Sequence, residues 1–494
     1  MMQLDYWKKK FQEKRKHTPV MEFITEVMSW KPFGFYKNKG LISRYPDTPR
    51  VKNIVSPKEF STLRDAMPYV TYDATKTFFQ NFQDLLLTVP LASLVQFNLN
   101  ENCDFSDCIF TAKNVYLSQV VGGDAENIYY SAFIYREVKD VFNSVLVNKN
   151  SSQIFQSTFI EKSYKIFYSK YIQNSSDIWF STNLVWCTHC IFCDGLENVS
   201  YSIKNVKLEK EEYEKQKQEI LKEKTKFDSY FLSLSKKALN YGAVNCSGNA
   251  LYFSENIENW FFVSRVKNGR NVFYAGIEQC EDFYDCFDVG LNSNNFYAAC
   301  SAWEVGSNHF YSVAEVGSSS NIFYSYHLEK CHYCIGCIWL RNKEFCIFNK
   351  QYTKEEWYTL ADEIFSNMEK DGSFGKYFPA WLTPFYYNDT MAYFVNPTVK
   401  KEDILQLWYL WREEKIKVDI PQWIEIMRLS DLWKFEVYIN GQWILSEEIL
   451  KKVIQDSEGN IYRVIKEEYD FLTKHELPLP RLHWMDRIKM CMKN

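Results

Sequence analysis

The phrase Asn114-Val-Tyr-Leu-Ser118 returns along the chain as Asn127-Ile-Tyr-Tyr-Ser131, Asp140-Val-Phe-Asn-Ser144, Gln153-Ile-Phe-Gln-Ser157 and Asp177-Ile-Trp-Phe-Ser181. Each copy has a polar residue, a branched aliphatic residue, an aromatic residue, any residue and then Ser. Neighbouring copies lie 12 or 13 residues apart between residues 103 and 193. Short β-prone segments at a fixed spacing, each too small to bury its own apolar face, are typical of a stacked solenoid.

The repeat predicts a mainly β fold, a parallel β-solenoid in which like residues stack at the strand spacing of about 4.8 Å. A coil of about 12 residues has little room for rings, so we expect about 12–13 residues per half-coil and roughly 25 per coil. The bulky rings, the Asn and Asp residues and the Ser and Cys residues would then each form a ladder. The phrase returns after residue 245, for example as Asn308-His-Phe-Tyr-Ser312 and Asn321-Ile-Phe-Tyr-Ser325.

A longer repeat indicates that the solenoid is duplicated. A shift of 144 residues aligns Cys187-Thr-His-Cys-Ile-Phe-Cys193 with Cys331-His-Tyr-Cys-Ile-Gly-Cys337, and residues 187–220 share 13 of 34 positions with their counterparts. We therefore expect two tandem solenoid units, each followed by a helix. The predicted regions are 1–100 (mixed α), 101–206 (first solenoid unit), 207–240 (charged helical insertion), 241–349 (second solenoid unit), 350–399 (helix and Pro/aromatic arm) and 400–494 (α+β).

Local signals predict the elements outside the solenoid. Thr353 followed by Glu356 is a capping box for a helix that ends near Gly372. The turn signals at Asn440-Gly441 and Glu458-Gly459-Asn460 predict two hairpins. Apolar periodicity and charge predict the other helices, at residues 57–66, 74–87, 207–240, 404–414 and 466–475.

Composition narrows the class of protein. The 58 Lys and Arg nearly balance the 62 Asp and Glu, giving a net charge of −4, which disfavours general coating of a polyanion. The 17 Gly residues are few, and the usual phosphate-loop and hydrolase motifs are missing. No secretory signal follows the first Met and no apolar run reaches membrane-spanning length, so we expect a cytoplasmic protein without a membrane partner.

The two Cys triplets offer candidate zinc sites. Cys187, Cys190 and Cys193 lie beside His189, and Cys331, Cys334 and Cys337 lie beside His332. Three thiols and an imidazole suffice for a tetrahedral Zn²⁺ or for part of an Fe–S site. The alternative is that Cys replaces Ser in the stacked corners, as Cys193 does in register, and the duplication explains why the triplet occurs twice.

An acidic row offers the second candidate site, formed by Glu278, Glu281, Asp282, Asp285 and Asp288. Stacked carboxylates on a solenoid could serve a glycoside hydrolase or lyase if two of them lay at the required separation. The alternative is a row of solvated turns.

Basic residues gather at both ends of the chain. Residues 1–20 hold six Lys and Arg against two acids, and residues 474–494 hold five against two. With Tyr6, Trp7 and Trp484 nearby, these ends could bind phosphates and stack on bases. The alternative is an ordinary charged helix surface.

Several segments resemble a family of uncharacterised Cys-rich tandem-repeat proteins of candidate-phylum bacteria, often mislabelled with a CoA-transferase family name. The resemblance rests on the Cys/aromatic repeats, on residues 340–357 (LRNKEFCIFNKQYTKEEW), on residues 375–388 (GKYFPAWLTPFYYN) and on residues 77–90 and 477–483. It implies zinc-ribbon Cys pairs near the N-terminus, but residues 1–102 contain no Cys. The family lends no established activity.

The sequence favours a non-enzymatic β-solenoid scaffold that binds a macromolecular partner, a protein or a nucleic acid. Nucleic acid or a ribonucleoprotein is the first specific expectation, because of the basic ends and the zinc-ribbon relatives. The alternative is a carbohydrate-active solenoid that uses the row at residues 278–288.

Overall fold

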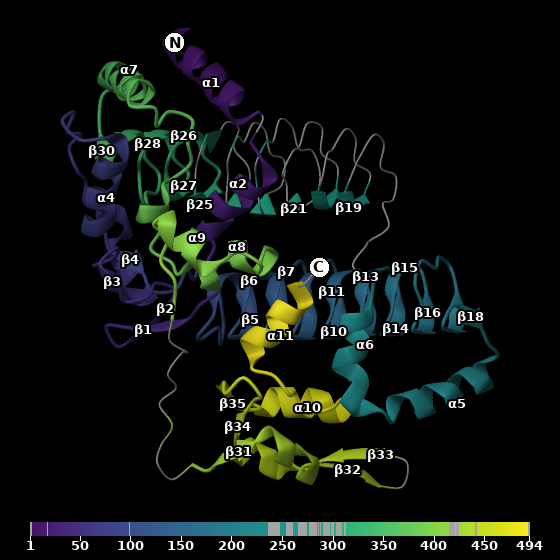
Figure 1. Cartoon of the computed structure of the whole chain (residues 1–494). Coiled ribbons are helices and arrows are strands. Elements are labelled where there is room, and N and C mark those ends of the chain that lie inside the picture. The colour runs from purple at the N-terminus through teal and green to yellow at the C-terminus, as the bar shows by residue number, and fades with distance from the viewer. Residues whose placement is uncertain are drawn as a thin grey trace. The chain divides into compact units, whose positions relative to one another are not determined.

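The computed structural model describes residues 2–16, 18–97, 99–235, 313–413, 424–439 and 442–492, together with short pieces at 248–252, 260–264, 274–275, 288–289, 301–302 and 309–310 and the single residues Tyr284, Cys286, Tyr297 and Ile420. The chain forms two compact units. Unit 1 comprises Met1–Leu94 and Leu239–Glu413, and unit 2 comprises Val95–Ala238 and Glu414–Asn494. The structure confirms a mainly β protein built on parallel solenoids (Figure 1).

The unit 2 solenoid is a single 14-stranded sheet that winds around its own axis. One ladder runs β6-β8-β10-β12-β14-β16-β17 and the other β6-β7-β9-β11-β13-β15. The strands are β5 (Asp107–Tyr116), β6 (Gln119–Tyr129), β7 (Ala132–Tyr135), β8 (Lys139–Phe142), β9 (Val145–Asn148), β10 (Ser152–Phe155), β11 (Thr158–Glu161), β12 (Tyr164–Phe167), β13 (Lys170–Gln173), β14 (Ser176–Trp179), β15 (Thr182–Val185), β16 (Thr188–Ile191), β17 (Ser200–Ile203) and β18 (Val206–Lys207).

The coil is half as long as the sequence suggested. Ile154 of β10 pairs with Ile166 of β12 on one side and with Val141 of β8 on the other, and each of these partners belongs to the adjacent copy of the phrase. One phrase therefore makes a full coil, and the expectation of one phrase per half-coil was wrong. The rings lie outside the interior: Phe155 packs against Phe471, 6.1 Å away between ring centroids.

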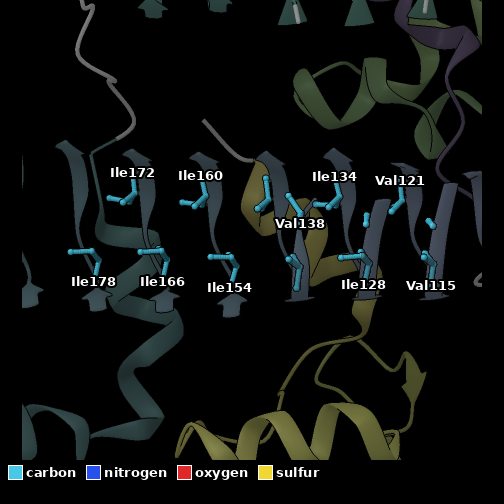
Figure 2. Packing of buried hydrophobic residues seen from close by; sticks show 14 of the residues in the cluster. Val115, Val121, Ile128, Ile134, Val138, Ile154, Ile160, Ile166, Ile172 and Ile178 are labelled. Carbon is cyan, nitrogen blue, oxygen red and sulfur yellow. The ribbon is translucent and has the colours of Figure 1, made fainter. Parts of the chain in front are cut away.

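One apolar residue from each of the strands β7 to β16 fills the interior. Ile154, Ile166 and Ile178 form one buried row, and Ile160 and Ile172 form the row opposite (Figure 2). These residues are at most 1 % exposed. Since each aliphatic residue meets others of its kind above, below and across, a coil too small to bury an apolar face alone becomes stable by stacking.

Left-handed residues turn the chain at regular intervals. Gln153, Gln156, Phe159 and Lys162 have φ between +46° and +59°, and the same conformation recurs at every third residue through Phe192. A coil with such a residue at every third position has four short sides. Each non-glycine residue in this conformation costs roughly 1 kcal/mol, so the hydrogen-bonded stacking has to offset it.

Buried Ser residues join one coil to the next at a corner. The Ser157 hydroxyl donates to the Phe155 carbonyl, 2.8 Å away, and accepts from the Ser169 amide, 3.1 Å away. Ser169 repeats the pattern with Ser181. The Ser at the last position of the phrase therefore provides hydrogen bonds to a backbone carbonyl and a backbone amide that the turn leaves buried.

Four helices and a small α+β region pack with this solenoid in unit 2 (Figure 1). They are α5 (Lys210–Leu221), α6 (Phe227–Ser233), α10 (Lys466–Lys474) and α11 (Trp484–Met492), with β31 (Ile426–Arg428), β32 (Glu436–Ile439), β33 (Gln442–Leu445), β34 (Val453–Gln455) and β35 (Ile461–Tyr462). The single helix expected over 207–240 was wrong, because the α-helical backbone stops at Leu221 and resumes at Phe227 after a 3-10 turn.

Unit 1 contains the second solenoid and most of the other helices. Its helices are α1 (Met2–Arg15), α2 (Val20–Glu26), α3 (Pro57–Leu63), α4 (Phe78–Thr88), α7 (Lys354–Lys370), α8 (Met391–Val395) and α9 (Lys401–Gln406). Its first strands are β1 (Tyr36–Asn38), β2 (Leu41–Ser43), β3 (Ile54–Val55) and β4 (Leu91–Ala92). The helix expected over 404–414 was wrong, since α9 ends at Gln406.

The second solenoid uses the same coil. Its described strands are β19 (Gly248–Tyr252), β20 (Trp260–Ser264), β21 (Tyr274–Ala275), β22 (Asp288–Val289), β23 (Ser301–Ala302), β24 (His309–Phe310), β25 (Val313–Gly317), β26 (Ser320–Phe323), β27 (Tyr326–Glu329), β28 (His332–Ile335), β29 (Glu344–Ile347) and β30 (Lys350–Gln351). Tyr274 pairs with Asp288, and Ile322 pairs with Cys334.

The structure confirms the duplication strand by strand. Adding 144 to the bounds of β14, β15, β16, β17 and β18 gives the bounds of β26, β27, β28, β29 and β30. The same shift carries the first residue of α5, Lys210, onto the first residue of α7, Lys354. Of these two helices, α7 has the predicted capping box, in which Thr353 and Glu356 exchange hydrogen bonds, and α5 has none.

Candidate functional site

Two adjacent sides of the unit 2 solenoid are open. We call them the open wall; one side carries Asn114, Asn127, Asp140, Gln153, Tyr164 and Lys165, and the next carries Lys149, Glu161, Lys162, Asn174 and Trp186. These residues are half-buried or exposed, and the rings of Tyr164 and Trp186 are 43 % and 47 % exposed.

An amide row runs along the first open side. The Asn102 amide donates to Asn114 at 3.1 Å, Asn114 donates to Asn127 at 2.9 Å, and Asn127 donates to Asp140 at 2.8 Å. Stacked coils place these side chains above one another, which confirms the Asn/Asp ladder expected from the repeat. Such a row presents a regular, rigid series of hydrogen-bonding groups to solvent.

Several charges along the open wall pair with opposite charges of a neighbouring coil. Lys139 pairs with Glu126 at 2.9 Å, and Lys149 pairs with Glu161 at 2.7 Å. Lys113 pairs with Glu101 at 3.2 Å. These pairs offset part of the positive charge of the open wall.

The side of the solenoid that follows the amide row along each coil is covered by the chain itself. Phe142 packs on Phe471 of α10 at 4.5 Å between centroids, and Phe180 packs on Phe227 of α6 at 4.8 Å. From α11, the Cys491 thiol donates to the Asn143 carbonyl at 3.2 Å. The protein therefore uses one side for its own packing and leaves the open wall to solvent.

The Cys triplets lie inside the solenoids. Cys187, Cys190 and Cys193 occupy three successive inward positions of one coil, and Cys331, Cys334 and Cys337 do so in unit 1. Stacking adds a fourth thiol in unit 1, since Cys346 pairs in register with Cys334. All seven thiols are at most 1 % exposed. The spacing of the cysteines in the sequence is thus the spacing of inward positions.

These thiols make the bonds that Ser makes elsewhere in the ladder. The Cys193 thiol lies 3.4 Å from the Ile191 carbonyl, and the Cys193 amide donates to Ser181 at 2.9 Å. Hydrogen bonding to Cys190 lowers the pKa of Cys187 to about 7. In the described part of the chain, no three His, Cys, Asp or Glu side chains are placed to share a metal ion. Zinc binding by the triplets stays a prediction.

The imidazoles beside the triplets point outward. His332 forms a hydrogen bond through Nδ1 with the Ser320 hydroxyl at 2.7 Å. His189 forms one through Nδ1 with the Asp177 carboxylate, also at 2.7 Å. Each histidine therefore contacts the equivalent position of the preceding coil, on the outer surface, while the thiols fill the interior.

Around Asp177 the structure reveals a charged cluster that the sequence reasoning missed. Lys217 of α5 pairs with Asp177 at 2.7 Å, and the Trp179 indole donates to it at 3.1 Å. Although burial opposes ionisation, Lys217 and the hydrogen bonds hold the pKa of Asp177 below its usual value. His189 also stacks on Tyr201 at 4.7 Å. The spacing of Asp177 and His189, one phrase apart, was the available signal, but Lys217 comes from the docked helix.

The acidic row falls largely outside the described residues. Glu278, Glu281, Asp282 and Asp285 are not among them, and Asp288 begins strand β22. The carbohydrate-active alternative therefore stays a prediction. Exchange of Glu281 for Gln and Asp285 for Asn, assayed on a panel of polysaccharides, tests it directly.

The basic residues at the two ends of the chain pair with acids of their own unit. In unit 1, Arg15 pairs with Glu26 at 3.3 Å and Lys10 pairs with Glu369. In unit 2, the pairs are Arg481 with Glu436 at 2.9 Å, Arg487 with Glu468 at 2.5 Å and Lys489 with Asp486 at 3.5 Å. These pairings leave less free positive charge for phosphates than the sequence count suggested.

No protein-family model, no curated protein and no solved structure matches the chain. Among the helices in the described ranges, none combines the length and the apolar character needed to cross a bilayer.

Proposed function

We propose that the protein is a non-enzymatic scaffold that binds a macromolecular partner along the open wall of unit 2. The observation that supports this most directly is the asymmetry of the solenoid: its own helices cover one side, whereas the open wall keeps an ordered amide row and two exposed rings, Tyr164 and Trp186. Preformed hydrogen-bonding groups on a rigid sheet lose little conformational entropy when a partner binds.

The chemistry of the open wall favours a partner recognised through hydrogen bonds and ring contacts. Three Lys residues along it, Lys113, Lys139 and Lys149, are already paired with carboxylates, so their charges contribute little attraction. Aromatic residues are enriched at protein interfaces, and exposed rings also stack on unpaired bases. The prediction of a nucleic-acid or ribonucleoprotein partner is therefore kept as one outcome of the experiment.

Site-specific photo-crosslinking in a lysate of the native host tests the proposal. Benzoylphenylalanine replaces Tyr164 or Trp186 in the open wall, and Tyr69 of unit 1, 58 % exposed, serves as the matched control. We expect discrete adducts at positions 164 and 186 and none at 69. Equal labelling at all three positions, or none in the open wall, would contradict the proposal.

The class of partner follows from the purified adducts. If nuclease collapses the adduct to the mass of the free chain, the partner is a nucleic acid. If nuclease leaves it intact and peptide mapping shows a second sequence, the partner is a protein. A ribonucleoprotein gives adducts of both kinds.

A further inference from the structure

A small cavity lies in unit 2 between the solenoid and its covering helices. Its volume is about 10 Å³, which is room for one water molecule or one monatomic ion. Gln156 and Tyr168 line it from the solenoid, and the charged residues that line it are Lys224, Asp228, Arg481 and Arg487. Charged groups from the α6 region and from the C-terminal segment thus meet in a space that holds a single atom.

Arg487 of α11 is the most unusual of these groups. Its side chain is 4 % exposed, and Nη1 pairs with Glu468 at 2.5 Å. Nε and Nη2 are buried and have no hydrogen-bond partner in the described structure. A buried donor left without a partner costs roughly 1–3 kcal/mol. The two free donors form one edge of the guanidinium.

The same edge is occupied in another arginine of this chain. In unit 1, Arg412 uses Nε and Nη2 to hold the two carboxylate oxygens of Asp389 at 2.6 and 2.7 Å. Nε and Nη2 of Arg412 therefore both donate to a carboxylate, whereas Nε and Nη2 of Arg487 have no hydrogen-bond partner in the described structure. The contrast indicates that a partner is missing at Arg487.

The other charges around the cavity are also mainly positive. Lys224 is 4 % exposed, and burial lowers its pKa to about 7. Arg481 pairs with Glu436, and Arg487 pairs with Glu468; neither glutamate lines the cavity. Asp228 does line it, and burial raises the pKa of its carboxyl group despite the nearby Arg481 and Arg487. Two arginines, each paired with a glutamate outside the lining, and Lys224, which also donates to the Glu476 carbonyl, therefore line the cavity with one carboxyl group.

We propose that this cavity binds one monatomic anion of the size of chloride, held by the free edge of Arg487 and by Lys224. The volume is too small for a phosphate or sulfate group. An anion fits this lining better than a water molecule does, because it accepts only, as the two unpartnered donors of Arg487 require, and because its charge favours the protonated form of Lys224. Since the lining comes from the solenoid, from α6 and the turn before it, and from the C-terminal segment, the anion would tie the covering layer to the solenoid.

Thermal unfolding of the full chain tests the proposal. Ionic strength is held constant while sodium gluconate is replaced by sodium chloride or bromide. We expect Tm to rise by about 2–4 °C between 5 and 500 mM halide, as mass action requires for a ligand bound by the folded state. The variant Arg487→Met should lose this dependence. Arg463→Met, which removes an exposed arginine of the same unit outside the cavity, should keep it.

A bromide-soaked crystal of the unaltered chain locates the ion even if Arg487→Met fails to fold. An anomalous peak between Arg487 and Lys224 supports the proposal. A water molecule at that place, or bromide only elsewhere on the surface, overturns it. A Tm that is the same in gluconate and in halide, or a halide dependence retained in Arg487→Met, also overturns it.

Discussion

The last coils of the two solenoids are built from duplicated sequence, yet one cap is apolar and the other is charged. In unit 1, Tyr333 stacks on Phe345 at 4.9 Å, and Trp357 of α7 meets Tyr333 edge-on at 5.6 Å. In unit 2 the corresponding residues are His189, Tyr201 and Tyr213 of α5. His189 stacks on Tyr201 at 4.7 Å, and Tyr213 meets His189 edge-on at 6.0 Å.

The geometry of the two caps is therefore conserved while their chemistry differs. Asn321 and Ala361 of unit 1 correspond to Asp177 and Lys217 of unit 2, which form an ion pair at 2.7 Å. Ring stacking at the end of the solenoid is the common structural device. The ion pair and the imidazole that stacks on Tyr201 are additions of unit 2, so the unit 2 cap contains a charged cluster at the position where unit 1 has Asn321 and Ala361.

The largest effect is expected at the apolar cap. Exchange of Trp357 for Ala removes a side chain with no exposed surface and its indole bond to the Cys346 carbonyl. Such a truncation costs about 3–5 kcal/mol in local stability. Hydrogen exchange of the amides of β28 and β29 measures it. Tyr358→Ala, at the half-buried neighbour, is the control and should cost less than half as much. A loss below about 1 kcal/mol at Trp357 would show that α7 does not stabilise the cap.

The sequence allowed the class of fold and the duplication to be predicted, because the phrase spacing and the 144-residue shift are properties of residue order alone. The size of the aromatic residues did not predict the coil length, because the rings lie outside the coil and not in its interior. The usable signal was the branched aliphatic residue at every sixth position, from Ile154 through Ile160 and Ile166, which marks two opposite inward positions in each coil.

The candidate sites were predictable to a smaller extent. Cys187, Cys190 and Cys193 were expected to lie near one another, and they do so because inward positions recur at every third residue. The pairing of Asp177 with His189 follows from their spacing of one phrase. Lys217 reaches Asp177 only because α5 packs on the solenoid. The unpartnered donors of Arg487 lie beside a cavity that forms only when distant segments pack together. Neither feature therefore has a local signal in the sequence.

The second largest effect is expected when Asp177 is exchanged for Asn, the residue at the corresponding position 321 of unit 1. Asp177→Asn leaves Lys217, whose side chain is 16 % exposed, without a counter-charge. We expect a loss of about 1–3 kcal/mol at pH 7, measured by hydrogen exchange of the amides of β14 and β16. The matched control is Asp140→Asn on the same open side, away from α5, with a loss below about 1 kcal/mol.

The contribution of Asp177 depends on pH with a definite sign. Its pKa is lower in the folded chain than in the unfolded chain, so the unfolded state binds the proton more readily. The stabilisation is present above the ordinary aspartate pKa of about 3.9 and is lost as pH falls through the lower folded value. Unfolding in urea between pH 3 and 7 should narrow the difference between the original chain and Asp177→Asn toward the acid end. A difference that stays constant over this range would assign the effect to packing.

A smaller effect is expected when the imidazole is exchanged for the ring of the other cap. His189→Tyr keeps the stack on Tyr201 but removes the hydrogen bond to Asp177. Because the His189 side chain is 35 % exposed, we expect a loss of no more than about 1 kcal/mol. If His189→Tyr in the Asp177→Asn background costs as much as it does alone, the two residues are not coupled. That result would break the interpretation of the unit 2 cap as one charged cluster.

The smallest effect, and one of opposite sign, is expected at Tyr213. Its hydroxyl is buried without a hydrogen-bond partner in the described structure, and burial together with the Asp177 charge raises the pKa of the phenol. Tyr213→Phe keeps the ring against His189 and below Lys217, so the exchange should be neutral or should stabilise the cap by up to about 1 kcal/mol. Hydrogen exchange at β16 and β17 measures the difference, with Tyr201→Phe as the half-buried control. A loss above about 1 kcal/mol would mean that the hydroxyl has a partner in solution. The cap would then contain a bound water or ligand that accepts the Tyr213 hydroxyl. Trp357, the counterpart of Tyr213 in unit 1, has no hydroxyl and could not bind it in this way.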